Sequence, residues 1–229
     1  MTTIVAALIG AFIGSVGATL AEAAIASRAD VEKRRQAVAT RYLFQLQDAV
    51  ESLWYRLDNA AHHAAAEVTT DAYLRTSSLY ALGRVLCLER VLVLEGVYAE
   101  LASLDKDLAE YLQREGLLDR AFARIRFMRY DRVALAETLL QREEGSFRPS
   151  TYLEFRAHLE ELDEKGQRWL TPAEQAVADL LAAPGSMQAL LDATEGLARR
   201  ISAFTGFACS IRHGETARGG AAGTATNMA

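Results

Sequence analysis

Proline and strand-like runs are scarce in this chain. Its 229 residues contain only three prolines, at positions 149, 172 and 184, and hardly any run alternates Val, Ile or Thr with polar residues. Leu and Ala dominate instead. Because proline interrupts helices and alternating β-branched residues are typical of strands, this composition predicts an all-α protein.

The cysteine and charge content argue against several classes of function. Cys87 and Cys209 lie far apart and form neither a disulfide framework nor a CxxC metal pair, which is typical of a reducing compartment. The formal net charge of -5 argues against a generic nucleic-acid binder, so we expect no nucleic-acid partner.

Common signatures of enzymes and cofactor sites are missing. The sequence contains no GxxxxGK[ST], no GxGxxG after a strand, no GxSxG and no HExxH. His63 and Glu67 lie one helical turn apart beside His62, but a catalytic zinc needs about three protein ligands. We therefore predict no enzymatic activity, no metal and no cofactor.

The N-terminus has no charged side chains. Residues 1–21 are uncharged, and a mostly apolar run continues to Arg28. A helix needs about 20 apolar residues to cross a bilayer, so we predict a transmembrane anchor over residues 1–26. Basic residues outnumber acidic ones just after it, which predicts a single-pass protein of the cell membrane with a cytoplasmic C-terminal domain. The alternative is a signal peptide cleaved after Ala26, although a positive n-region is lacking.

Small and bulky side chains segregate on the predicted anchor helix. Val5, Leu8, Phe12 and other bulky residues share one face. The opposite face carries small residues that permit close helix packing in lipid: Ala7, Gly10, Gly14, Gly17 and Ala21. The pattern predicts a homo-oligomer or pairing with a partner membrane helix.

Residues 27–212 are predicted to form an all-helical cytoplasmic domain. No Gly or Pro interrupts residues 18–63, which predicts one long helix. An apolar seam at spacings of three and four follows it: Leu43, Leu46, Val50, Leu53 and Leu57. A second helix is expected from Thr70 or Asp71 to about Leu104, and it is apolar on nearly every side, as in the centre of a bundle.

Four charges interrupt that central helix. They are expected either to form buried ion pairs or to line a groove: Arg84, Glu89, Arg90 and Glu95. A basic stretch further along is interleaved with Phe122, Phe127 and Tyr130. Its arginines predict an anion- or lipid-binding patch: Arg120, Arg124, Arg126, Arg129 and Arg132.

Helix starts and stops are predicted in the C-terminal half. A helix is expected to continue to Gly145, and Thr151 with Glu154 has the spacing of a capping box. Thr171-Pro172-Ala173-Glu174 predicts another start, with Thr171 as N-cap, and that helix should stop near Ala183. A last helix is expected from about 186 to 204, and residues 213–229 are predicted to be a disordered tail.

Residues 211–216, IRHGET, resemble the opening motif of the histidine phosphatase family. The resemblance implies an α/β domain in which His213 accepts phosphate and Arg212 holds it. The family's chemistry also needs a further Arg, a carboxylate and a second His from the domain that follows. Only sixteen residues follow His213, and none is His. We therefore interpret these six residues as a coincidence.

These observations favour a membrane-anchored scaffold or regulatory protein that binds an unknown cytoplasmic protein and self-associates. One alternative is an oligomer whose N-terminal helices permeabilise the membrane. Another is an enzyme with a site around Arg84, Glu89 and Arg90. The enzyme predicts a concave pocket with converging charges, whereas the scaffold predicts a closed core.

Overall fold

The computed structural model describes residues 25–63, 71–114, 122, 127–164 and 170–211. The predicted small-residue face, most of the predicted anchor and the predicted tail lie outside these ranges. No helix in the described ranges combines the length and the hydropathy that a bilayer crossing requires.

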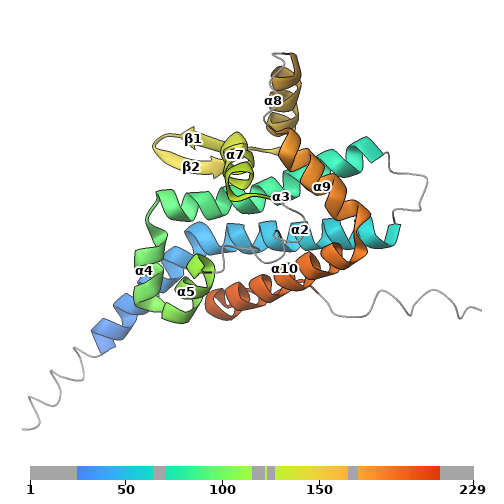
Figure 1. The fold of residues 1–229 in the computed structure, drawn as a ribbon. Coiled ribbons are helices and arrows are strands. Elements are labelled where there is room, and N and C mark those ends of the chain that lie inside the picture. The colour runs from blue at the N-terminus through green and yellow to red at the C-terminus, as the bar shows by residue number, and fades with distance from the viewer. Residues whose placement is uncertain (1–24, 64–70, 115–121, 123–126, 165–169, 212–229) are drawn as a thin grey trace, which may run out of the picture.

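The described residues confirm a mostly helical protein. Residues 25–38 form a helix that continues through a π-helical turn into α2. The elements in order are η1 (Ala39–Leu43), α2 (Phe44–His63), α3 (Asp71–Leu94), α4 (Val97–Leu104), α5 (Lys106–Arg114), α7 (Arg129–Leu139), β1 (Leu140–Glu143), β2 (Ser146–Pro149), α8 (Tyr152–Glu164), α9 (Thr171–Ala182) and α10 (Pro184–Thr205) (Figure 1).

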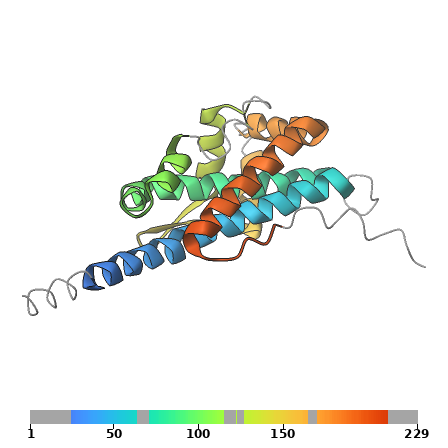
Figure 2. The ribbon, with the colours of Figure 1, turned by 90° about the horizontal axis from the view of Figure 1, so that it is seen from below.

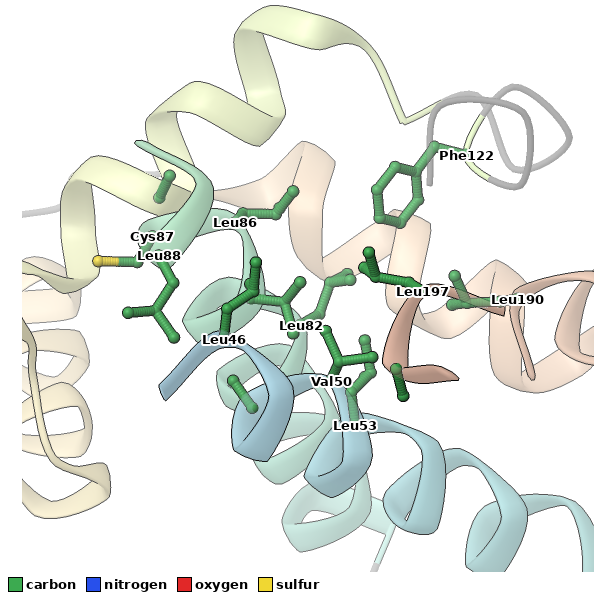
Figure 3. Close-up of a cluster of buried hydrophobic side chains, with 14 of the residues drawn as sticks. Leu46, Val50, Leu53, Leu82, Leu86, Cys87, Leu88, Phe122, Leu190 and Leu197 are labelled. Carbon is green, nitrogen blue, oxygen red and sulfur yellow. The ribbon is translucent and has the colours of Figure 1, made fainter. Parts of the chain in front are cut away.

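The core lies where α2 packs against both α3 and α10. The chain reverses between α2 and α3, and α10 crosses α2 on its other side (Figure 2). Every residue of the predicted seam is at most 1% exposed, which confirms the seam: Leu43, Leu46, Val50, Leu53 and Leu57. Figure 3 shows Leu46, Val50 and Leu53 pointing into the cluster with side chains of α3 and α10.

α3 is the central helix, as its apolar sequence predicts. It packs on α2 and also contacts α7, α9 and β2. Gly83 allows the close approach of α7, because a Cβ atom at this position would lie 2.8 Å from Leu139 Cδ1. Partners on several sides explain why α3 lacks a polar face.

The expectation of one helix reaching Leu104 is wrong, because α3 ends at Leu94. Gly96 follows in a left-handed conformation with φ of 67°, which glycine adopts without steric cost. The chain then turns, and α4 packs against α5. Gly96 therefore acts as a helix stop and separates Glu95 from the body of α3.

The expectation of a helix up to Gly145 is also wrong. α7 ends at Leu139, and β1 pairs with β2 in an antiparallel hairpin that starts at Leu140 and ends at Pro149. Glu144 and Gly145 form its two-residue loop, with φ of 48° and 86°. Two positive φ angles are typical of the primed turns that match the twist of a hairpin.

The predicted start of α8 is confirmed. The Thr151 amide donates to Glu154 Oε2 at 2.6 Å, and the Glu154 amide donates to Thr151 Oγ1 at 3.3 Å, which makes a capping box. Arg148 on β2 also binds the Glu154 carboxylate at 3.1 Å. Chiefly through that bond, the pKa of Glu154 is lowered to about 2.

The start of α9 differs from the prediction in its cap. Leu170 occupies the N-cap position, and Thr171 is the first helical residue. Pro172 in the first turn still fits, because its missing amide would have no partner there. α9 stops at Ala182, close to the predicted end.

The last described residues of the chain are extended rather than helical. After α10 ends at Thr205, Gly206 caps the helix and residues 207–211 run back along α2. Tyr55 donates to the Ser210 carbonyl at 2.6 Å, and Phe44 contacts Phe207 edge to face. The expected end of the last helix near 204 is close to the observed end of α10 at Thr205.

We expect the two thiols to differ strongly in reactivity. Cys87 is fully buried, and burial raises the pKa of its thiol to about 12, so little reactive thiolate forms at neutral pH. Cys209 is partly exposed. A thiol reagent should therefore modify Cys209 in the folded chain and both cysteines in denaturant. Cys209→Ser is the control, and rapid labelling of that folded variant would contradict the prediction.

Candidate functional site

Three of the four charges predicted on the central helix pair with residues of other helices. Arg84 pairs with Asp48 of α2 at 2.8 Å, and Arg90 pairs with Glu137 of α7 at 3.2 Å. Glu95 pairs with Arg41 of η1 at 3.6 Å. These side chains are partly exposed, not buried. The pairs therefore join helices at the edge of the core.

A cavity of about 560 Å³ lies between α3, α4, α5 and α7. This volume is in the range of small-molecule sites. Its wall combines apolar and charged residues: Leu86, Glu89, Arg90, Val93, Tyr98, Leu112, Gln113, Arg129, Arg132, Val133 and Ala136. We call it the arginine pocket.

Two facing helices supply most of this wall. On α3, Leu86, Glu89, Arg90 and Val93 recur at spacings of three and four. On α7, the lining residues follow the same spacing, from Arg129 to Ala136. Residues at these spacings share one helical face, so each helix presents a stripe to the cavity. Tyr98 of α4 and residues of α5 complete the wall.

Positive charge dominates the arginine pocket. Three guanidinium groups face one lining carboxylate, Glu89. The guanidinium of Arg132 lies over the Phe122 ring at 5.2 Å, which holds it beside the cavity. Arg90 Nε is buried and has no hydrogen-bond partner among the described residues. The site therefore favours an anion.

Tyr98 adds a hydrogen-bonding group to the wall. Burial, and secondly the Glu89 carboxylate, raises the pKa of its hydroxyl far above the usual value. The phenol consequently stays protonated at any physiological pH and is able to donate a hydrogen bond.

The pocket unites two sets of residues that the sequence suggested separately. Glu89 and Arg90 come from the central helix, and Arg129 and Arg132 come from the basic stretch. Arg84 and Glu95 do not line it. The other arginines of that stretch lie outside the described residues: Arg120, Arg124 and Arg126.

Sequence reasoning missed Tyr98 and Gln113. Both lie on short helices that follow the turn at Gly96, and nothing in their spacing relates them to α7. The stop signal of Gly96 itself was available in the sequence. With α4 placed after that turn, Tyr98 becomes a candidate for the end of α3.

A second, smaller cavity of about 190 Å³ lies between η1, α2, α3 and β2. Arg41, Glu95 and Arg148 line it with several apolar residues. Two of these three charges already pair with each other, and Arg148 binds Glu143 and Glu154. Each of these three charges therefore has an oppositely charged partner.

The phosphatase-like motif falls largely outside the described residues. Only Ile211 is described, and its side chain is buried against the core. It ends an extended segment that follows α10, whereas the family's motif follows the first strand of an α/β domain. This placement agrees with our interpretation of the motif as a coincidence.

Comparison with known proteins gives no family. No family model matches the chain, and no curated protein or solved structure is significantly similar to it. The described residues also contain no group of three or more metal-ligating side chains. The function therefore has to be inferred from the geometry itself.

The lining of the arginine pocket is suited to binding. Among its residues, Glu89 is the one carboxylate, and none is Ser, Thr, Cys or His. Nucleophilic and acid–base mechanisms usually draw on those side chains together. The concave pocket and its converging charges resemble what the enzyme alternative predicts, but Arg84 points to Asp48 instead. An anion-binding role fits this lining better.

Proposed function

We propose that the protein is a membrane-tethered helical adaptor. Residues 1–26 act as a single-pass anchor in the cell membrane, and the bundle works in the cytoplasm by binding another protein. The small-residue face over Ala7 to Ala21 brings copies of the anchor together, or pairs it with a partner membrane helix. The protein acts without catalysis in this proposal.

The helix just after the anchor segment supports this arrangement. Residues 27–34 are exposed on every face, and contact with the bundle begins at Arg35 and Val38. Figures 1 and 2 show this helix projecting beyond the bundle. We call residues 27–38 the stem. Contacts with the bundle stabilise an unpacked helix of this kind very little. Such a helix is suited to be a rigid link between an anchor and a domain.

The charges of the stem fit the same proposal. Arg28, Lys33 and Arg34 are exposed, and Arg34 is offset by Asp30 at 3.3 Å. Basic residues next to an anchor favour the cytoplasmic side and are attracted to anionic headgroups.

The stem also has a firm attachment to the bundle. Arg35 donates two hydrogen bonds, at 3.1 and 2.7 Å, to the Phe204 carbonyl at the end of α10. Its guanidinium also lies over the Phe204 ring at 4.7 Å. A cation at a helix C-terminus is favourable, so this contact fixes the direction of the stem.

Deleting residues 1–26 should release the protein from membranes without unfolding the bundle. We expect the full chain to remain with membranes after alkaline extraction and its body to resist protease added from outside. The deleted variant should be soluble, with an unchanged circular dichroism spectrum apart from the loss of the segment.

A deletion of residues 213–229 is the matched control, because it shortens the other end and should leave the protein on membranes. Membrane association of the chain without residues 1–26 would contradict the anchor. A shorter soluble form outside the cytoplasm would show cleavage after Ala26 and would contradict the tethered adaptor as well.

A further inference from the structure

We propose that the arginine pocket binds a phosphate monoester that carries a short apolar chain. The phosphate lies among Arg90, Arg129 and Arg132, and the apolar part lies along the wall formed by Val93, Tyr98 and Val133. Two sources share this chemistry, the headgroup region of an anionic phospholipid and a free phosphorylated amphiphile.

The charge of the pocket matches a phosphate. Three arginines and Glu89 leave two positive charges in the lining. Counting Glu137, which pairs with Arg90 at 3.2 Å, still leaves one. A phosphate monoester carries roughly −1.5 to −2 charges at neutral pH. Guanidinium groups bind its oxygens in a planar fork, which a lysine cannot do.

The start of α7 adds to this attraction. Arg129 is its first residue, and the N-cap residue Met128 makes no side-chain hydrogen bond to the first-turn amides. Such amides and the helix dipole favour an anion. Asp131 in the same turn opposes the effect in part, but it does not line the pocket.

Buried donors give the anion specific partners. Arg90 Nε is buried without a hydrogen-bond partner among the described residues, and the Tyr98 hydroxyl stays protonated. The Tyr98 hydroxyl can therefore donate to a bound phosphate oxygen. The guanidinium of Arg90 is held in place by Glu137 at 3.2 Å, and its charge lies beside the cavity.

The rest of the wall suits an apolar chain. Val93 is 50% exposed at the last turn of α3, and the side chains of Tyr98 and Val133 are partly exposed. A ligand with a phosphate alone would leave this apolar wall wet. Each buried methylene contributes about 0.8 kcal/mol, so a short chain adds considerable affinity.

The position of the pocket favours the lipid as the source. The pocket lies towards the C-terminal end of α3, and the stem projects from the same end of the bundle (Figure 1). The pair between Arg41 and Glu95 joins η1, which follows the stem, to the end of α3 at 3.6 Å. The choice of a lipid rests on the proposed tether, whereas the binding of the phosphate does not.

Hexyl phosphate tests the site. We would titrate it by calorimetry into the full chain in phosphatidylcholine nanodiscs, or in buffer if the chain does not associate with membranes. We expect saturable binding, at least about tenfold tighter than for inorganic phosphate or hexanol, because each lacks half of the ligand.

Two variants and their controls locate the binding. Arg129→Glu reverses an exposed charge of the pocket, and we expect at least about tenfold weaker binding. Arg75→Glu, an exposed arginine elsewhere on α3, should have no effect. Val93→Glu places a carboxylate in the wall and should also weaken binding. Leu94→Glu is its matched control, since Leu94 is exposed to a similar degree and lies outside the lining.

The source is decided by adding phosphatidic acid to the nanodiscs. Weaker apparent binding of hexyl phosphate in those discs would show that the lipid headgroup occupies the pocket, and unchanged binding would identify a free amphiphile. The proposal is overturned if hexyl phosphate does not bind, or if Arg129→Glu and Val93→Glu bind it as tightly as their controls. Failure of the membrane tether would leave the titration in buffer interpretable.

Discussion

Replacing Leu53 by alanine should lower the free energy of unfolding by about 2–5 kcal/mol. Leu53 is fully buried in the seam of α2, between α3 and α10. Truncation removes apolar contacts and leaves a cavity that the surrounding helices fill only in part. Because whole domains are stable by about 5–15 kcal/mol, this one change removes a large share. Chemical denaturation followed by circular dichroism measures it.

Leu153→Ala on α8 is the control for this substitution. Leu153 is 76% exposed, so the same chemical change should alter the free energy of unfolding by no more than about 0.5 kcal/mol. Equal effects at the two positions would show that the seam of α2 is not the core of the protein.

The seam was predictable because a buried helix face appears in the sequence as apolar residues spaced three and four apart. Leu43, Leu46, Val50, Leu53 and Leu57 repeat with the period of a helix, and that period fixes which face is buried. The central position of α3 was predictable in the same way, from its own residues. A helix that is packed on several sides is apolar on all of those sides. The capping box of Thr151 and Glu154 involves neighbours in sequence, and it was found for the same reason.

The hairpin depends on contacts between distant residues. The segment from Leu140 to Glu143 has good helix formers, yet it pairs with β2, which packs on α3. Its loop places Glu144 at φ of 48°, a conformation that most side chains avoid. Tertiary packing therefore overrides local propensity here, and propensity is a weak guide in such cases.

The arginine pocket was predictable only in its parts. The sequence marks Glu89, Arg90, Arg129 and Arg132 as unusual, but it does not show that α3 and α7 face each other. That arrangement requires the close approach at Gly83, and the fourth side of the pocket requires the turn at Gly96. Both glycines are visible in the sequence, but their role becomes clear only when the partner helices are placed.

Replacing Gly83 by leucine should lower the free energy of unfolding by about 1–3 kcal/mol through overpacking. A Cβ atom at this position would lie 2.8 Å from Leu139 Cδ1 and 3.2 Å from Leu135 Cδ1, so a whole leucine side chain has no room. This loss should exceed the stabilisation of about 1 kcal/mol that is expected when a glycine in a helix is replaced by a better helix former. Because α7 must move away from α3, hexyl phosphate should also bind more weakly.

Two further variants separate overpacking from other effects. Gly196→Ala on α10 should raise stability by roughly 0.5–1 kcal/mol, because no atom lies within 4 Å of the added Cβ. Leu139→Ala alone should be destabilising, since Leu139 is fully buried. Combined with Gly83→Leu, it should make room, so that the double variant loses less stability than the sum of the two. Strict additivity would mean that Gly83 does not set the spacing of α3 and α7.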